Sequence, residues 1–552
     1  MSSATAAPAQ TPEKIDGAVL KVAGVVVLGA IMSILDITVV NVALPHFQTD
    51  LAPAGQPPLD YSTVAWTVTA YTLALATVIP LTGWAADRFG TKRLYLTAIA
   101  LFVLGSVLCA FATSIEALIA FRVVQGLGGG MLMPLGMTIM TRAAGPERMG
   151  RLMAILGIPM LLGPIGGPIL GGWLIDNAHW LGRPSWSWIF LINLPIGIIG
   201  LVYAWLVLPK DHTEPSESLD VVGLLLMSPG LALFLYGVSS IADEQTFFAS
   251  KVIVPGTLGL VLMAIFAWWS FRPVHPLIDL RLFGNRNFTV AALTMFLFGG
   301  AFFGGLLLVP TYLQQVRGED TLHAGLLLAP QGLGAMVTMP IAGYLADKYP
   351  VGRIVPFGIA IITGGMFALT QISDDTSYWG YLIPVLFVMG LGMGMTMMPL
   401  MTSALKTLTA HQVARGSTTL NIVQQVASSF GVSVISVLLV NAFNARPLIG
   451  QAQAFGEESA KAADPSATGE LMARFPEVAK VLAGITDPGR ATEVLMAAVR
   501  SDMAAAFAST YWVAGGLCLL TLVVSLFLPR KHEESHLLEG DDESARMHVP
   551  VH

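Results

Sequence analysis

The stretch GWAADRFGTKR at residues 83–93 has a counterpart at residues 343–353, which reads GYLADKYPVGR. Both contain a Gly, an Ala-Asp pair, a basic residue and a terminal Arg in the same register. Each follows a long apolar segment and precedes a basic loop. Corresponding sequences in two parts of a membrane protein indicate parallel halves, a layout common among transporters. The sequence therefore predicts an internal repeat.

The composition is that of a protein that crosses the membrane many times. Of its 552 residues, 54% are hydrophobic and 12% are charged, whereas soluble domains carry about 25% charged residues. The net charge of −6 is not accompanied by a basic block, which argues against a nucleic-acid partner. Both cysteines, Cys109 and Cys518, lie in apolar runs, so neither a disulfide framework nor a cysteine-based metal site is expected.

The apolar pattern predicts fourteen membrane-spanning helices, because a span needs about 20 apolar residues. They lie near residues 18–45, 61–83, 94–113, 115–141, 150–175, 186–208, 219–241, 252–271, 288–313, 321–346, 351–372, 378–404, 413–441 and 506–528. An even number of spans places both termini on the same side of the membrane.

The basic residues predict that this side is the cytoplasm, because short cytoplasmic loops are enriched in Lys and Arg. With the N-terminus inside, the cytoplasmic loops hold Arg88, Lys92, Arg93, Arg142, Arg148, Arg151, Lys210, Arg272, Arg281, Arg286, Lys348, Arg353, Lys406, Arg415, Arg530 and Lys531. The short outer loops hold only Arg183, Lys251 and Arg317. We therefore expect a multi-pass protein of the plasma (inner) membrane with both termini in the cytoplasm.

The predicted organisation follows from these spans. Residues 1–17 are a disordered cytoplasmic tail, 18–208 a first six-helix bundle, 209–287 two extra spans with linkers, 288–528 a second six-helix bundle, and 529–552 a cytoplasmic tail. A long outer loop, 442–505, interrupts the second bundle. Apolar residues at helical spacing in 469–485 and 490–507 predict two amphipathic helices at the outer interface.

Five motifs resemble those of the major facilitator superfamily and occur in the order found in that family. GWAADRFGTKR resembles its inner-loop signature, RVVQGLGGG (122–130) its fourth-span motif, and GIPMLLGPIGGPILGGW (157–173) its fifth-span antiporter motif. LDITVVNVALP (35–45) and SWIFLINLPIG (187–197) are similar to the fourteen-span drug/proton antiporter branch. The resemblance implies an all-α fold of two six-helix bundles plus two extra central helices, and proton-driven export of amphipathic compounds.

The resemblance also bears on partners. It implies contact with membrane lipids, protons and an amphipathic small-molecule substrate, with no cofactor. Some related exporters need partner proteins, and this leaves open a periplasmic adaptor that nothing in the sequence identifies.

Asp36 is a carboxylate inside the first span, where an ionised acid costs about 2.5–3.5 kcal/mol on insertion scales. Arg122 is the basic residue that lies well inside a span. Asp36 lies about 14 Å and Arg122 about 10 Å from the outer ends of their spans, so the two can meet. We expect Asp36 to alternate between pairing with Arg122 and holding a proton, with Gln125 as a relay. The alternatives are an acid that only fixes packing through Thr38 or Asn41, and an arginine that only ties helices together.

The fifth span carries a stripe of small residues. Gly163, Gly167 and Gly171 are four residues apart and share one helix face, which allows a second helix to approach closely. Neighbouring prolines bend the helix. The complete motif comprises Gly157, Pro159, Gly163, Pro164, Gly167, Pro168 and Gly171. We expect a pivot or a seal, and plain packing is the alternative.

The inner-loop signatures predict a gate. An acid at a span end can cap a neighbouring helix or form an ion pair that breaks when access changes. The candidate residues are Gly83, Asp87, Arg88, Gly90, Lys92, Arg93 and Asp347. The alternative is that the basic residues only hold the loop inside.

The substrate cavity is less specified by the sequence. Polar residues at membrane depth and an aromatic cluster give the candidates Asn41, Phe302, Asn421, Gln424 and Gln425. Segments 288–313 and 378–404 contain no Asp or Glu, so the mid-span acid that the resemblance implies for some relatives is absent, which favours monovalent or neutral amphipathic substrates.

The sequence bears on four other classes of protein. A membrane enzyme or an ATP-driven pump is disfavoured because the chain has no HExxH and no P-loop motif. A passive channel would not require both Asp36 and Arg122. An exporter of an endogenous lipid or metabolite would share the fold and the proton coupling, and it remains the main alternative.

Overall fold

The computed structural model describes residues 17–531 except 54–55, 145–147, 179–181, 211–217, 245, 410–411, 462–471 and 486. Within these ranges the secondary structure is helical. Most of the two predicted tails and part of the predicted outer loop lie outside the described residues.

The first bundle comprises α1 (Gly17–Asp50), α2 (Tyr61–Phe89), α3 (Thr91–Ala110), α4 (Ile115–Ala144), α5 (Met149–Asn177) and a sixth span formed by α6 (Ser187–Leu191) with α7 (Asn193–Val207). The two intervening helices are α8 (Val221–Glu244) and α9 (Ser250–Trp269). The second bundle comprises α10 (Arg286–Gln315), α11 (Thr321–Lys348), α12 (Val351–Ala368), α13 (Ile383–Gly394) with α14 (Met397–Lys406), α15 (Val413–Asn444) and α19 (Pro488–Ser525).

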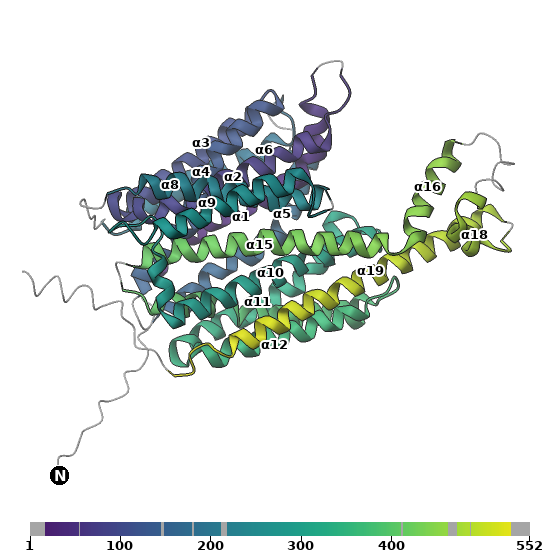
Figure 1. Cartoon of the computed structure of the whole chain (residues 1–552). Coiled ribbons are helices and arrows are strands. Elements are labelled where there is room, and N and C mark those ends of the chain that lie inside the picture. Colours follow the sequence, from purple (N-terminus) through teal and green to yellow (C-terminus); the bar gives the residue numbers. More distant parts are fainter. Residues whose placement is uncertain are drawn as a thin grey trace, which may run out of the picture.

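These helices confirm the predicted fold class. Thirteen helical segments among the described residues are long and apolar enough to cross a membrane. The continuous 29-residue α5 occupies the place of the fifth predicted span. Figure 1 shows the two bundles one above the other, with long helices running in a common direction.

In both repeated signatures the eighth residue lies between two helices, but that residue differs between the two halves. α2 ends at Phe89 because Gly90 adopts a positive φ of 92°, which glycine tolerates without steric cost. In the second half Pro350 stands at the equivalent place, between α11 and α12, and proline has no N–H with which to continue a helix.

The intervening helix α8 contacts both bundles. Ser228 on α8 donates a hydrogen bond to the carbonyl of Thr77 on α2 at 2.6 Å. Ser433 on α15 donates to the carbonyl of Val238 on α8 at 2.7 Å. The helix pair α8 and α9 therefore lies along one side of the junction between the bundles.

The two bundles meet at one end of the molecule, which we call the basic end. This end carries the α2–α3, α4–α5 and α11–α12 connections, with Arg88, Lys92, Arg93, Arg142, Arg151 and Arg353. There Thr138 and Ser417 share a hydrogen bond of 2.8 Å, and Asn421 donates to Met137 Sδ at 3.0 Å. These residues lie within about ten residues, or about 15 Å, of the basic ends of their helices.

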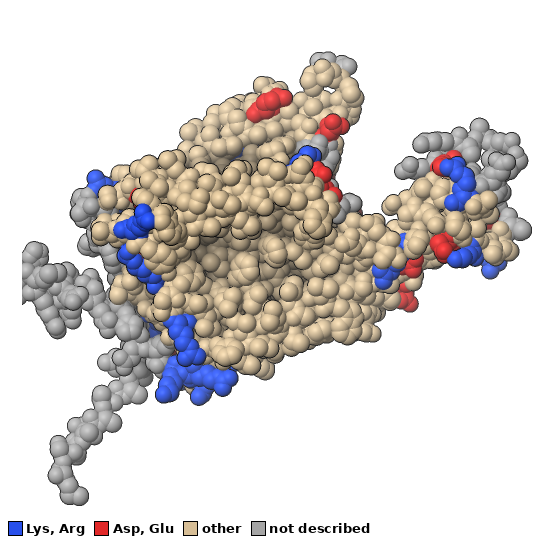
Figure 2. Space-filling model, viewed as in Figure 1, with Lys and Arg blue, Asp and Glu red and all other residues tan. Residues whose placement is uncertain are grey.

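The two bundles diverge toward the opposite end, from which α16 projects (Figure 1). Lys and Arg gather at the basic end, and the surface is hollowed between the two halves (Figure 2). The structure is therefore closed at its basic end.

The outer segment differs from the two expected amphipathic helices. It contains α16 (Pro447–Lys461), which was not expected, and α18 (Pro476–Leu482), which lies within the first expected helix; the second expected helix is the first part of α19, continuous with the last span. Leu448, Phe475, Val478, Leu482 and Leu495 form a separate apolar cluster. The apolar faces of this segment pack on one another, and the segment projects away from the bundles (Figure 1).

Close backbone contact between α10 and α15 yields a stability prediction. A Cβ added at Gly431 would lie 2.0 Å from the carbonyl oxygen of Gly300, so Gly431→Ala should destabilise the protein by about 1–3 kcal/mol. Gly516 on α19 has nothing within 4 Å of the same position, and Gly516→Ala should be neutral or stabilising by about 1 kcal/mol. Thermal unfolding of the two purified variants tests this, and equal unfolding temperatures would contradict it.

Candidate functional site

The predicted pair of opposite charges is formed in the first bundle. Arg122 Nη1 on α4 donates to Asp36 Oδ2 on α1, and the two side chains are 0% and 1% exposed. Gln125 on α4, one turn away, donates from Nε2 to Asp36 Oδ1 at 2.7 Å. All three residues of the proposed proton-coupling set are therefore in direct contact.

The guanidinium of Arg122 has further partners besides the acid. Its Nε donates to the carbonyl of Thr67 at 3.0 Å, and Nη1 also donates to Gln125 Oε1 at 2.8 Å. The guanidinium carbon lies 4.0 Å from the centre of the Tyr71 ring, within the range of a cation–π interaction. Arg122 thus keeps several contacts that do not depend on the charge of Asp36.

Two residues that the sequence analysis did not predict, Asn193 and Ser106, complete this site. Asn193 Nδ2 makes a long hydrogen bond of 3.5 Å to Asp36 Oδ1 and one of 3.0 Å to Ser106 Oγ. Asn193 begins α7 where the sixth span is interrupted, two residues before Pro195. Its position as an amide inside the apolar motif SWIFLINLPIG was the available signal.

In the first inner-loop signature, the acid pairs with an arginine of its own bundle. Asp87 Oδ1 lies 3.4 Å from Arg142 Nη2 at the end of α4. Lys92 donates to the carbonyls of Trp205 and Leu208 at 2.7 Å and so caps the end of α7. Arg88 lies half-buried in the last turn of α2, and Arg93 is exposed.

The second signature crosses between the bundles. Asp347 Oδ1 on α11 accepts a hydrogen bond from the backbone N–H of Gly150 at 2.7 Å, and Oδ2 accepts one from Arg151 Nε at 3.0 Å. The carboxylate therefore caps the first turn of α5, where a negative charge is favoured by the helix dipole. In the first signature, Gly83 on α2 is the residue close to the other bundle: a Cβ atom at this position would lie 3.1 Å from Thr418 on α15.

The glycine stripe of α5 packs against α1, the helix that carries Asp36. Cβ atoms built at Gly163, Gly167 and Gly171 would lie 2.1 Å from Ile34, 1.9 Å from Thr38 and 3.2 Å from Val39. Thr38 donates to the carbonyl of Gly163 at 3.0 Å.

The rest of the motif lies elsewhere on α5. Gly157 instead faces Met339 and Met398 of the second bundle, and Pro159 is buried. Pro164 and Pro168 lie within α5, and their side chains are outside the described part of the chain.

The candidate cavity residues are not gathered at one place. Asn41 is exposed on α1, Phe302 is buried between Phe298 and Phe303, and Asn421 lies in the closed contact at the basic end. Gln424 and Gln425 are half-buried on α15. Among the described residues, no group of three or more His, Cys, Asp or Glu could hold a metal ion.

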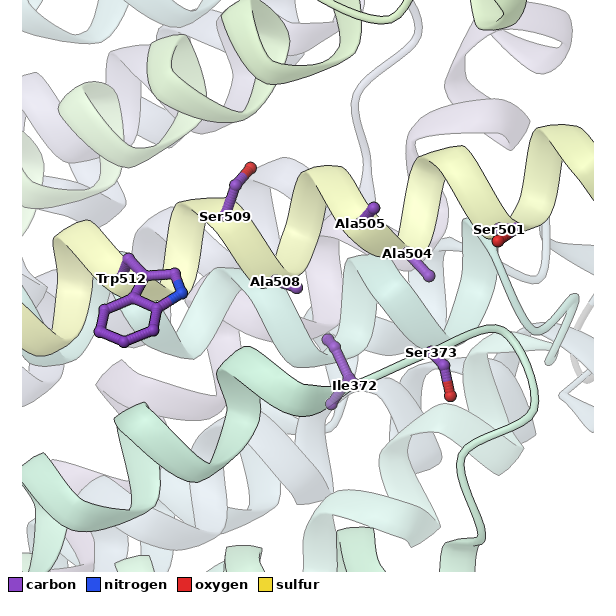
Figure 3. Close-up of a pocket in the computed structure, with 8 residues that line it drawn as sticks. All are labelled: Ile372, Ser373, Ser501, Ala504, Ala505, Ala508, Ser509 and Trp512. Atoms are coloured by element: carbon purple, nitrogen blue, oxygen red, sulfur yellow. The ribbon is translucent and has the colours of Figure 1, made fainter.

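A separate pocket of about 370 Å³ runs along α19 in the second bundle. Figure 3 shows small side chains on one face of this helix, with Trp512 at one end of the pocket and Ile372 and Ser373 opposite. None of the predicted site residues lines it.

Comparisons with known proteins agree with the architecture. A family model described as Major Facilitator Superfamily matches residues 26–432. The Multidrug resistance protein B homolog of Mycobacterium tuberculosis is 45% identical over 95% of this chain and 92% of its own length. The Fatty acid resistance protein FarB of Neisseria gonorrhoeae is 31% identical over 74% of this chain and 79% of its own length. The crystal structure of the human organic anion transporter MFSD10 aligns with a TM-score of 0.55 at 15% identity, covering 91% and 99% of the two chains.

The contact between Asp347 and α5 yields a prediction about closure at the basic end. Asp347→Ala removes charge-assisted hydrogen bonds worth about 1.5–3 kcal/mol each, so the ratio of closed to open molecules should fall by about tenfold or more. Thiol labelling of a Met339→Cys reporter measures this, because Met339 is buried against Gly157 and both native cysteines are buried.

The matched control lies on the same helix. Asp320 caps the other end of α11 through His323 N at 2.7 Å and should not affect the reporter when replaced by Ala. Labelling that rises equally in both variants, or in neither, would contradict a closing role for Asp347.

Proposed function

The chain belongs to the major facilitator superfamily, and from this premise we propose that it is a proton-coupled antiporter. It exports amphipathic drugs or other hydrophobic small molecules across the plasma membrane by alternating access. As a member of this family it is a transporter rather than an enzyme. The names of its relatives support drug export, and the buried pair of Asp36 and Arg122 supports the proton coupling.

The observation that carries the proposal is a titratable acid that shares its site with a permanent cation. Burying two charges is costly unless they are paired and hydrogen-bonded. A proton on Asp36 neutralises the acid and ends its ion pair, while Arg122 stays bound to Thr67 and Gln125. Protonation therefore leaves the buried charge of Arg122 without its counter-ion, and the neutral acceptors and the Tyr71 ring offset only part of that cost, so the protonated state favours a rearrangement.

These two states can drive alternating access. The enrichment of Lys and Arg at the basic end supports a cytoplasmic location for that end and for both termini. The described conformation, closed at the basic end, is then closed to the cytoplasm. A proton that arrives from outside discharges Asp36 and weakens the α1–α4 contact, which favours rocking of the bundles. Release of that proton inside restores the ion pair and resets the transporter.

The same reasoning limits the substrate class. Segments 288–313 and 378–404 contain no Asp or Glu that could balance a second positive charge. The proposed substrates are therefore monovalent or neutral amphipathic molecules, which reach the protein through membrane lipids. Export by the protein reconstituted alone would show that it needs no periplasmic adaptor.

Export of an endogenous lipid is the alternative substrate assignment. A lipid-like substrate is supported by the similarity to a relative named for fatty acid resistance. An accumulation assay with a panel of dyes and lipids, in cells with and without the protein, distinguishes the two substrate classes.

Neutralising the acid tests the coupling. Asp36→Asn keeps the shape of the side chain and removes its ability to exchange a proton, so export driven by a pH gradient in proteoliposomes should fall to the level of empty liposomes. Asp320→Asn removes an exposed carboxylate and should leave export unchanged. Unfolding temperatures of both variants confirm that they are folded.

Two results would contradict the proposal. Normal gradient-driven export by the Asp36→Asn protein would remove Asp36 from the mechanism. Solute flux through the unmodified protein that does not respond to the pH gradient would identify a passive channel.

A further inference from the structure

Ser106 on α3 has a saturated set of hydrogen bonds beside the ion pair. Its side chain is fully buried, and its Oγ lies 2.9 Å from the carbonyl oxygen of Phe190, 3.1 Å from Gln125 Nε2 and 3.0 Å from Asn193 Nδ2. A carbonyl oxygen can only accept, so the single hydroxyl proton of Ser106 is directed at Phe190. Toward the two amides, Ser106 can therefore act only as an acceptor.

This restriction fixes which end of each amide faces the site. An amide NH₂ group has two protons. Gln125 Nε2 directs one to Ser106 and the other to Asp36 Oδ1 at 2.7 Å, and Asn193 Nδ2 reaches the same two acceptors. Turned over, either amide would direct its oxygen at the lone pairs of Ser106 and at the carboxylate.

The two amides differ in how strongly they depend on Ser106. Gln125 has a second anchor, because its Oε1 accepts from Arg122 Nη1 at 2.8 Å and from Cys109 Sγ at 3.6 Å. For Asn193, the described side-chain bonds are the two made by Nδ2. Loss of the Ser106 hydroxyl should therefore release Asn193 more than Gln125.

We propose that Ser106 is a positioning residue that sets the proton affinity of Asp36, by holding the N–H groups of Gln125 and Asn193 toward the carboxylate. The inference rests on the proposed function, in which Asp36 carries the proton. Both N–H groups stabilise the ionised acid, whereas a protonated acid has less need of them. Without the acceptor at Ser106 the amides can turn, and the ionised form loses its donors.

Ser106 makes no described hydrogen bond to the other titratable or charged groups around Asp36. These are Tyr71 from α2, which lies against the Arg122 guanidinium, Cys109 from α3, which donates to Gln125, and Arg122 from α4, which is the charged member. On α5 the facing residues Gly163 and Gly167 do not titrate. A change in pH dependence can therefore be assigned to the amides.

The test is the pH profile of dye export by the full-length protein in proteoliposomes. Ser106→Ala should move the pH of half-maximal export upward by up to about one unit, because a full hydrogen bond to a charged group corresponds to about that shift and the bond from Asn193 is long. The sign follows because an acid whose ionised form has lost donors gives up its proton only at higher pH. Asn193→Ala should shift the profile in the same direction by a smaller amount.

The controls separate positioning from a general structural role. Ser106→Thr keeps the hydroxyl and should keep the original profile. Ser525→Ala removes a buried hydroxyl of α19 that bonds only within its own helix, and should cause no shift. The double variant Ser106→Ala/Asn193→Ala should shift less than the sum of the single variants, because both changes act on one hydrogen bond.

The outcomes distinguish this inference from the proposed function. Export by Ser106→Ala that is slower but has an unchanged profile would overturn the positioning role and leave proton coupling by Asp36 intact. If Ser106→Ala does not fold, an unchanged profile for Asn193→Ala overturns it instead. Export by the unmodified protein that does not depend on the pH gradient would overturn both.

Discussion

The ion pair between Asp36 and Arg122 constrains the whole of the first bundle. Two charges removed from water must satisfy one another and nearly all of their remaining hydrogen-bonding capacity. Three other helices therefore supply partners: Thr67 and Tyr71 from α2 and Asn193 from the interrupted sixth span contact the pair, and Ser106 from α3 bonds to Gln125 beside it. Shifting any of these helices along its axis would leave a buried polar group without its hydrogen bond. The pair therefore fixes the axial positions of these helices relative to one another.

Backbone contacts through glycine make this arrangement possible. The Cβ position of Gly105 lies 2.5 Å from the backbone of Gln125, and that of Gly128 lies 2.4 Å from the backbone N of Phe102. α3 and α4 thus approach closely enough for Ser106 to reach the Gln125 amide. On the other side of α1, Gly163 and Gly167 let α5 approach next to Ile34 and Thr38. The glycine stripe, for which the sequence predicted a pivot or a seal, packs against the helix that carries the buried acid. A change in the charge of Asp36 can therefore alter the packing of α1 on α5.

The fold was predictable because apolar segments, basic loops and a repeated signature can all be read from the order of residues along the chain. The meeting of Asp36 and Arg122 was predictable from depth alone. Ser106 and Asn193 were missed because their roles depend on the direction in which each side chain leaves its helix, and depth does not determine that direction. The two signatures show a similar limit: they look equivalent in sequence, yet Asp87 pairs with Arg142 inside its bundle whereas Asp347 reaches α5 of the other. The length of α19 was missed because its amphipathic first part and its apolar second part appeared to be separate helices.

The continuity of α19 has a mechanical consequence. This helix has 38 residues, so it is about 57 Å long, and it joins the second bundle to the outer segment without an interruption. A stiff rod anchored at one end behaves as a lever arm. Any tilt of the second bundle is therefore converted into a larger sideways excursion of the apolar cluster around Phe475 and Val478 at the far end. The outer segment therefore changes its position relative to the first bundle whenever the second bundle tilts.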